Sequence, residues 1–414
     1  MANVLFCPVT FNLAETTRMI QVARALAPQH HPVFMGYEDD FVSLIVDAGF
    51  EHRACTPSWS RAEREQAVAY DQGRAIRTPF TTELVAARVE VERRLIRQLN
   101  APVVVTGSNL TSYLSARAEK VPLLYPVPFA LTLAQVEQTS HMEFVRGSSR
   151  IARAADLIAT SAFRWLYTRA PLAPRAFSKV AKANGVPPLK TVASLLTADR
   201  NLLTEMPWEL AGYRIPEGFE RVGPIFAHVD APLPPIVEEL AAASTPLVYL
   251  ALGSSATRAL ALDAARALGT MPVNVIAPIR HYLEPNDAVP ANVHVTDLLP
   301  AHKLGGLVDA AVIHGGQGTV QTACATGVPF VGMGLQPEQT WHVRACERRG
   351  NAVAISPRRV SKPEFVKAVQ RVLTDPAIRT AAAEVCEAYA LEDGAAVTAR
   401  IIGAEIEQPG RFTR

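Results

Sequence analysis

The amino-acid sequence predicts an α/β protein with two domains, each built on a parallel sheet of the Rossmann type. In both halves of the chain, short apolar runs alternate with amphipathic stretches of helical period. The runs are apolar at nearly every position, which is typical of strands buried on both faces. The length of 414 residues exceeds one compact core and fits two domains of roughly 200 residues.

The first half of the chain begins as strand, helix and strand. Residues 3–9 form an apolar strand, a polar loop follows, and an amphipathic helix at 17–27 precedes a strand at 33–36. The alternation recurs as a strand at 102–106, a helix at 112–120 and a strand at 122–125. We therefore expect residues 1–225 to form the N-terminal domain.

A change of composition separates the two halves. Residues 226–245 contain the run Ala-Pro-Leu-Pro-Pro and an Ala-rich turn, which are typical of a linker. Over 246–377 the alternation restarts, with strands expected at 247–252, 273–277, 293–295, 309–313 and 329–332 and helices at 259–268 and 318–326. Open parallel sheets bind ligands at the carboxyl ends of their strands, so we expect ligands in a cleft between two such halves.

The amino-acid composition and net charge indicate which class of protein this is and which partners it can bind. Apolar residues make up 49% and charged residues 19%, which suits a globular protein with a large core. The formal charge of +2 gives no overall footprint for nucleic acid, so we expect no nucleic-acid partner. The five cysteines have no paired spacing, no signal segment is recognised, and the apolar runs are too short to span a bilayer. We expect a cytoplasmic protein.

One segment is distinctly basic. Between residues 143 and 182, eight Arg or Lys residues follow Glu143 against a single Asp, with aromatic residues among them. A solvated helical face is the favoured interpretation. The alternative is weak contact with an anionic surface, either an acceptor or membrane headgroups, because basic amphipathic stretches bind there.

The strongest chemical signal follows the apolar run at 310–313. It is the sequence His-Gly-Gly-Gln-Gly-Thr, made of His314, Gly315, Gly316, Gln317, Gly318 and Thr319. Glycines at a strand-to-helix turn let backbone N–H groups approach a ligand, and the helix N-terminus adds roughly half a positive charge. His314 can donate a hydrogen bond to a phosphate, and Thr319 can cap the helix and bind an oxygen. The pattern predicts an anion site.

A second turn of this kind follows the strand at 247–252. It contains Gly253, Ser254 and Ser255, which offer hydroxyl and backbone donors. A single Gly-rich turn is weak, because about half of such turns are only tight turns. Two in one domain, both at strand ends, strengthen the prediction of a phosphate site.

The C-terminal half resembles the nucleotide-sugar domain of the family 1 glycosyltransferases, the UDP-glycosyltransferase group, which have the GT-B fold. The likeness rests on the order and spacing of the motif at 314–319, then Ala325, Gly327 and Pro329, then an acidic residue followed by Gln at Glu338 and Gln339. It extends over nearly the whole chain and is weakest at about 130–220. By analogy, residues 378–414 would form helices that cross back to the N-terminal domain.

The resemblance assigns roles to particular residues. The Gly-rich loop would hold the diphosphate, with Ser254 and Ser255 opposite it, and Glu338 and Gln339 would bind sugar hydroxyls. Leu298 stands where many members carry the Trp that stacks on the nucleobase, and Leu299 beside it is the other candidate for contact with the nucleotide. Aromatic stacking is lost there, so the base remains either uracil or thymine. No metal and no cofactor are implied, because helix-terminal amides can neutralise a leaving diphosphate.

The N-terminal domain would bind the acceptor and supply the catalytic base. Members carry a His in the loop after the first strand, and here Glu15 stands at that position. Their partner Asp is also missing, because the later loop reads Gly107-Ser108-Asn109. Asn12, Ser108 and Asn109 are the candidates for the acceptor side. A free Glu has a pKa near ~4.3, so Glu15 as a base requires burial or an acidic or strongly nucleophilic acceptor. Alternatively, Glu15 is only a first-turn residue that favours the helix dipole.

The expected activity is inverting transfer of a hexose or deoxyhexose from a UDP- or dTDP-sugar to a hydrophobic natural-product or glycolipid acceptor. The Leu-Ala-x-x-x-Arg pattern at 13–18 resembles rhamnosyltransferase-like members of the family. Two alternatives stay open. One is a catalytically silent homologue that binds a nucleotide sugar or assists a partner enzyme. The less favoured one is a sugar-nucleotide epimerase of the same fold.

Overall fold

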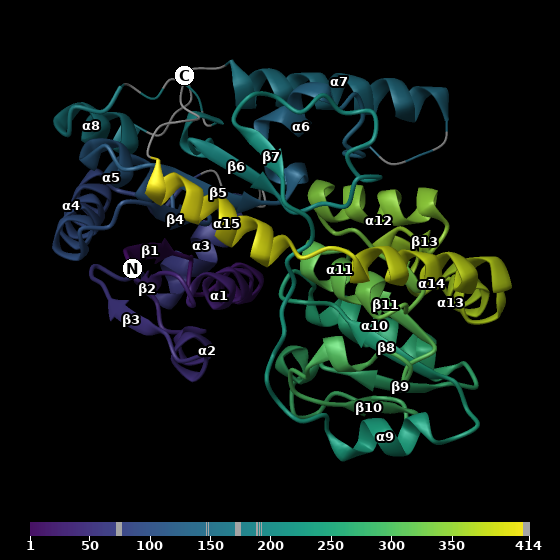
Figure 1. Ribbon diagram of the computed structural model, residues 1–414. Coiled ribbons are helices and arrows are strands. Elements are labelled where there is room, and N and C mark those ends of the chain that lie inside the picture. Colours follow the sequence, from purple (N-terminus) through teal and green to yellow (C-terminus); the bar gives the residue numbers. More distant parts are fainter. Residues whose placement is uncertain are drawn as a thin grey trace. The chain divides into compact units, whose positions relative to one another are not determined.

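The computed structural model describes residues 1–71, 77–145, 147, 149–169, 175–187, 189, 191 and 193–408. The chain divides into two compact units. The first contains Met1–Ile225 together with Asp393–Arg414, and the second contains Phe226–Glu392. Each unit is a parallel sheet with helices packed on it (Figure 1), so the prediction of two parallel-sheet α/β domains is confirmed.

The first unit is built on a seven-stranded sheet in the order β3-β2-β1-β4-β5-β6-β7. Every neighbouring pair in it is parallel. The strands are β1 (Asn3–Cys7), β2 (His31–Gly36), β3 (Glu51–Ala54), β4 (Val104–Thr106), β5 (Leu123–Val127), β6 (Arg200–Leu203) and β7 (Phe219–Arg221). The order reverses between β1 and β4, which makes the carboxyl ends of these strands the switch point where such sheets bind ligands.

The helices of the first unit come mainly from the crossovers between these strands (Figure 1). Those within Met1–Ile225 are α1 (Leu13–Leu26), α2 (Val42–Asp47), α3 (Arg61–Asp71), α4 (Thr82–Leu99), α5 (Ser112–Glu119), α6 (Leu133–Gln138), α7 (Arg150–Thr168) and α8 (Arg175–Ala183). The first helix begins at Leu13 rather than at residue 17, because the side chain of Asn12 accepts the backbone N–H of Glu15 and caps it. No helix in the described ranges is long and apolar enough to cross a membrane.

The second unit repeats the arrangement with six parallel strands in the order β10-β9-β8-β11-β12-β13. The strands are β8 (Leu247–Ala251), β9 (Asn274–Ala277), β10 (Val293–Val295), β11 (Ala310–Ile313), β12 (Phe330–Gly332) and β13 (Ala352–Ala354). Its helices are α9 (Pro235–Ala241), α10 (Arg258–Gly269), α11 (Gln317–Ala325), α12 (Pro337–Arg349), α13 (Pro363–Thr374) and α14 (Pro376–Ala390). Here the order reverses between β8 and β11.

Two segments group differently from the expected domain limits. The predicted linker at 226–245 contains α9, whose Val237 is fully buried, and this segment belongs to the second unit. Residues 378–414 were expected to cross back together, but they divide. Within the second unit, α14 lies against α11, where the Cys386 thiol donates to the Ala325 carbonyl at 3.1 Å. Only α15 (Gly394–Glu407) joins the first unit, where it packs on α1 and buries Ile402.

A glycine at the start of α15 permits this return. A Cβ on Gly394 would stand 2.3 Å from the Gly223 carbonyl oxygen and 2.5 Å from that of Pro224. Backbone atoms cannot swing aside as flexible side chains do. We therefore expect Gly394→Ala to lower the free energy of unfolding by about 1–3 kcal/mol, measured by denaturant titration.

Gly403→Ala in the same helix is the matched control. A Cβ there would meet His30 Nε2 at 3.6 Å and Gln29 Oε1 at 3.9 Å, which are ordinary contacts. Since alanine favours helix by about 1 kcal/mol over glycine, this variant should be neutral or more stable. Equal losses in both variants would contradict the close approach at Gly394.

Candidate functional site

In the second unit, two glycine-containing turns meet at the switch point of the sheet. Strands β8 and β11 are parallel neighbours, with Ala251 beside Ile313 in register. The turn at 253–255 leaves the end of β8, and the loop at 314–316 leaves the end of β11. The pairing of these strands therefore brings together the two turns predicted to hold a phosphate.

The His314 side chain fills the space between the two turns. It is buried, and its Nδ1 lies 3.4 Å from the Ala251 carbonyl oxygen. A Cβ on Gly253 or on Gly316 would stand 2.5 Å from the ring, so both positions need glycine. Burial lowers the pKa of His314, with small opposing effects from the Ala251 carbonyl and Glu338. The imidazole is therefore neutral near pH 7 and keeps one N–H to donate.

The N-terminus of α11 opens beside this ring. Gly316 is the N-cap, and no side chain makes a capping hydrogen bond. The prediction that Thr319 caps the helix is wrong. Thr319 lies inside the first turn, where its N–H donates to the Gly316 carbonyl at 3.0 Å. A helix end without a side-chain cap presents backbone N–H groups and a partial positive charge, which suits an anion.

Gly315 lets the loop pass close to α12. Its φ is +87°, and a Cβ would stand 2.8 Å from the Gln339 carbonyl oxygen and 2.6 Å from Val343. Among the following residues, Gln317 is buried, whereas Gly318 and Thr319 are half-buried. The backbone of this loop is thus packed on one side and accessible on the other.

Gln339 ties the serine turn to the loop that precedes α12. Its Nε2 donates to Ser255 Oγ at 3.1 Å, and its Oε1 accepts the Leu335 N–H at 3.0 Å. The side chain is buried, so the structure places it as a brace for the site. Ser254 beside it is exposed.

The other residues predicted to bind the donor differ in accessibility. Glu338 is half-buried, and its Oε1 lies 3.3 Å from Nε2 of the buried His342 one helical turn later. Leu298 is 60% exposed and so presents a free apolar side chain, whereas Leu299 is buried in the loop. An exposed leucine can cover an apolar ring face by simple contact.

In the first unit, Glu15 lies at the other switch point. Strands β1 and β4 are parallel neighbours, with Cys7 beside Thr106, so the loops that follow them meet. Glu15 sits in the first turn of α1, is only 5% exposed, and reaches into the loop after β4. Its Oε2 accepts the Ser108 N–H at 3.0 Å and the Ser108 hydroxyl at 2.8 Å. Its Oε1 accepts the Val9 N–H at 2.5 Å.

The environment of this carboxyl group raises its pKa. Burial is the main cause, and the hydrogen bonds from Val9 and Ser108 together with the charge of Arg18 oppose it. The carboxyl group lies directly over Gly107, where a Cβ would stand 1.8 Å from Oε1. Gly107 is therefore required by the position of Glu15. Ser108 itself is exposed, so its hydroxyl connects the buried carboxyl group to the surface.

The two remaining acceptor-side candidates serve the fold. Asn12 is the N-cap of α1, where its Oδ1 accepts the Glu15 N–H at 3.2 Å. Asn109 is buried, and its Nδ2 donates to Glu92 Oε1 at 3.1 Å. The buried Glu92 also accepts hydrogen bonds from Thr111 at 2.5 Å and from Tyr37 at 2.9 Å. Asn12 and Ser108 are both exposed, and of the three candidates Ser108 places a hydroxyl beside the Glu15 carboxyl group.

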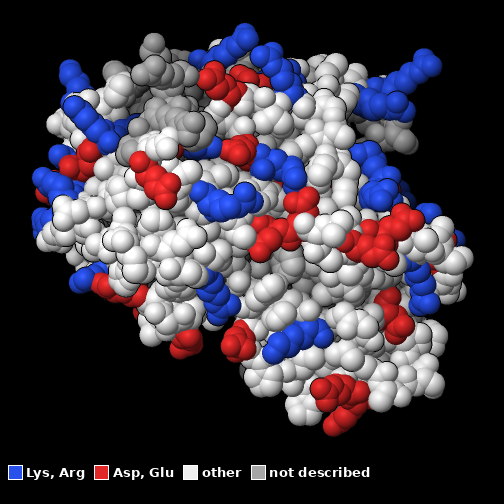
Figure 2. Space-filling view, in the orientation of Figure 1, with Lys and Arg blue, Asp and Glu red and all other residues white. Residues whose placement is uncertain are grey.

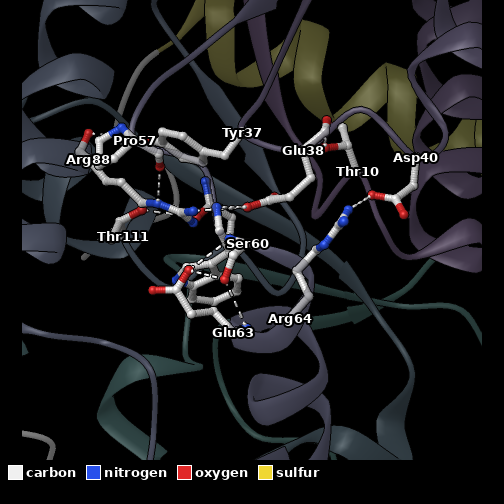
Figure 3. A network of polar contacts seen from close by, with 12 residues as sticks. Thr10, Tyr37, Glu38, Asp40, Pro57, Ser60, Glu63, Arg64, Arg88 and Thr111 are labelled. Atoms are coloured by element: carbon white, nitrogen blue, oxygen red, sulfur yellow. Dashed lines mark hydrogen bonds and ion pairs between the residues drawn. The ribbon is translucent and has the colours of Figure 1, made fainter.

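A buried ionic and aromatic network supports these loops (Figure 3). Arg88 Nη2 donates to Glu38 Oε1 at 2.9 Å with both side chains buried, and its Nε donates to the Pro57 carbonyl at 3.0 Å. The guanidinium lies 4.0 Å from the Tyr37 ring centre and 4.5 Å from that of Trp59. Paired and hydrogen-bonded in this way, the charges are tolerated inside the protein and hold together the loops after β2 and β3.

Sequence inspection missed three contributors to the two sites. They are the Val9 N–H, Gly107 and the close approach of Gly253 to His314. Gly107 and Gly253 both directly follow predicted strands, and a glycine at such a position is a signal for close backbone approach. The Val9 contact had no signal, because it depends on the fold of the loop.

In the part of the chain that the structure describes, no cluster of side chains is suited to bind a metal ion. No group of three or more His, Cys, Asp or Glu side chains there is arranged to hold an ion. The five cysteines are free, and four of them are buried.

Comparison with known proteins adds to this geometry. The family model described as "Erythromycin biosynthesis protein CIII-like, C-terminal domain" matches residues 264–401. The chain is 26% identical over 393 residues to the PGL/p-HBAD biosynthesis glycosyltransferase of Mycobacterium tuberculosis, covering 94% of this chain and 88% of that protein. It is also 26% identical over 400 residues to the PGL/p-HBAD biosynthesis rhamnosyltransferase of Mycobacterium bovis, covering 94% and 84%.

A solved structure shares the fold. The glycosyltransferase VinC in complex with DTDP superposes with a TM-score of 0.67 at 19% identity, covering 98% of this chain and 100% of that one. The structural likeness supports the fold, and the relatives and the family model support the enzyme class. Together these findings support a glycosyltransferase of the family 1, UDP-glycosyltransferase-like group with the GT-B fold, in the branch of natural-product and glycolipid biosynthesis.

Proposed function

We propose that the protein transfers a hexose or deoxyhexose from a UDP- or dTDP-sugar to a hydrophobic small-molecule acceptor, with inversion at the anomeric carbon. Binding of the sugar donor is supported above all by the N-terminus of α11. It has no side-chain cap and lies beside the neutral His314 ring and the serine turn. The complex of VinC with DTDP and the glycosyltransferase and rhamnosyltransferase names of the relatives support the choice of substrates.

The donor diphosphate would lie on the backbone of residues 315–319. These N–H groups and the helix dipole supply positive potential without a cation, so we propose metal-independent transfer. Leu298 would cover the face of the pyrimidine, and its lack of aromatic stacking fits either uracil or thymine. Glu338 is half-buried, with a carboxylate that can accept hydrogen bonds from sugar hydroxyls, whereas Gln339 would act by holding Ser255 in place.

Glu15 would serve as the base through Ser108. The acceptor hydroxyl gives its proton to Ser108 Oγ while the Ser108 proton passes to Glu15 Oε2, which lies 2.8 Å away. The acceptor oxygen then forms its bond to the anomeric carbon as the bond from that carbon to the diphosphate breaks. The nucleoside diphosphate leaves with the bonding electrons. A carboxyl group with a raised pKa is a better base for this task than a solvated one.

The second candidate function is that of a catalytically silent protein. It is favoured by the contacts of the Glu15 carboxyl group, which have a structural role of their own. Glu15 accepts hydrogen bonds from Val9 N–H, Ser108 N–H and the Ser108 hydroxyl, which together tie two loops. These hydrogen bonds stabilise the fold of the two loops even if Glu15 takes part in no reaction. Measurements of donor binding and of turnover therefore test separate parts of the proposal.

Nucleotide binding should be visible as thermal stabilisation. We expect dTDP or UDP to raise the melting temperature, because a ligand at one hundred times its dissociation constant adds about 2.7 kcal/mol to the folded state. His314→Ala should abolish the shift. His31→Ala, at the exposed start of β2 in the first unit, is the control and should retain it. No shift with either nucleotide at millimolar concentration would contradict the donor site.

Proton transfer from the acceptor through Ser108 to Glu15, here called the relay, predicts that loss of the Ser108 hydroxyl lowers activity. Ser108→Ala should lower kcat by about 10²-fold, because the carboxyl group loses its path to the acceptor. The KM for the donor should stay unchanged. Ser108→Thr keeps a hydroxyl and should retain activity within a few-fold, which controls for disruption of the loop. Steady-state kinetics with a phenolic or alcohol acceptor measures both. Full activity in Ser108→Ala would exclude the relay.

The pH dependence follows from the raised pKa of Glu15. The base must be ionised, so kcat/KM should rise with pH through the pKa of the folded protein. Because burial raises that pKa, the acid limb should lie above the ~4.3 of a free Glu. Glu15→Gln should remove the limb along with most of the activity. A limb at the free-Glu value would argue against a desolvated base, and dTDP stabilisation checks that the variant is folded.

A further inference from the structure

Helix α7 turns its polar side chains inward. Asp156 and Thr160, one turn apart, are buried and accept hydrogen bonds from the loop that precedes the helix. Asp156 Oδ1 accepts the Val145 N–H at 3.1 Å, and Asp156 Oδ2 accepts the Glu143 N–H at 3.3 Å. Thr160 Oγ1 accepts the Met142 N–H at 3.0 Å. These bonds fix the rotation of the helix about its axis.

The opposite side of α7 is apolar and exposed. Ile151, Ile158 and Trp165 are 82%, 70% and 57% exposed. They are spaced by about two helical turns, so they share one face, opposite Asp156 and Thr160. Phe163, on the same side of the helix as Asp156, is also partly exposed and packs against Phe144, with ring centres 5.3 Å apart. A helix packed on a core normally buries its apolar stripe, and α7 does the reverse.

The charges around this apolar stripe are positive. Arg150 lies exposed at its start and Arg169 just after its end, while Asp156, the only acidic residue of α7, is buried. Figure 2 shows Lys and Arg side chains at both ends of the upper edge where α7 lies in Figure 1, with Asp or Glu side chains beside those at the left end and uncharged surface between the two ends. An apolar stripe with tryptophan and flanking arginines matches the chemistry of an anionic lipid interface. Residues 146, 148 and 170–174 of the basic segment lie outside the described residues.

We propose that α7 docks the protein on the surface of an anionic phospholipid bilayer. Ile151, Ile158 and Trp165 would enter the boundary between headgroups and acyl chains, and the two arginines would reach phosphates. A face of α7 about 28 Å long and about 10 Å wide offers about 280 Å². That is well below the ~800 Å² per partner of a stable protein interface, whereas a bilayer needs no matching partner surface. The inference is independent of the proposed transfer reaction.

Vesicle co-sedimentation of the full chain tests the proposal. We expect binding to vesicles of phosphatidylcholine mixed with about one third phosphatidylglycerol, weakened by salt, and much less binding to phosphatidylcholine alone. The double variant Ile158→Glu with Trp165→Glu should bind the anionic vesicles at least about ten-fold more weakly. Arg150→Glu with Arg169→Glu should lose the preference for anionic lipid.

Leu391→Glu is the matched control, because Leu391 is 89% exposed and follows α14 in the second unit. It should bind vesicles as the unchanged protein does. Failure of the unchanged protein to bind anionic vesicles, or an equal loss in Leu391→Glu, would overturn the proposal.

Two further measurements distinguish binding to the bilayer from misfolding of the variants and from self-association. Thermal melting with and without dTDP shows that the α7 variants are folded, and vesicle binding is measured without a sugar donor, so its outcome does not depend on turnover. Sedimentation velocity addresses the other occupant of the stripe, a second copy of this chain. A dimer that Ile158→Glu with Trp165→Glu dissociates would overturn docking on a bilayer in favour of self-association.

Discussion

The parallel pairing of β1 with β4, and of β8 with β11, is the constraint on which both candidate sites depend. At these pairs the strand order reverses, so the loops that follow the two strands turn to opposite faces of the sheet and leave room between them. Residues far apart in sequence, such as Glu15 and Ser108, are brought into contact only by this pairing. The chemistry of each unit is therefore placed by its backbone topology.

Buried polar groups then hold the loops in position. In the first unit the Glu15 carboxyl group joins the loops after β1 and β4, and in the second Gln339 joins the serine turn to the start of α12. Removing such a group leaves buried donors without partners, which costs about 1–3 kcal/mol each. Glycines at 107, 253 and 315 complete the two sites, because a side chain at these positions would strike Glu15, His314 and the backbone of Gln339, respectively.

The same physical rule explains why α7 differs from the other helices. Elsewhere apolar residues line the cores between sheet and helices, as in the cluster around Val4, Phe6 and Ile402. In α7 the need to satisfy the amides of the preceding loop places Asp156 and Thr160 inward, and the apolar residues are left outside. Hydrophobic area that the fold does not bury is available to a partner.

By itself the sequence determined the two parallel-sheet domains and the loop at 314–319, because apolar strand, glycine turn and amphipathic helix are local patterns. It also placed Glu15 and Ser108 in loops that a parallel sheet brings together. Only the tertiary structure decided that Asn109 and Gln339 are braces, and that α14 and α15 join different units. Those outcomes depend on which distant atoms satisfy a buried donor or fill an apolar surface, and no local pattern encodes such long-range contacts.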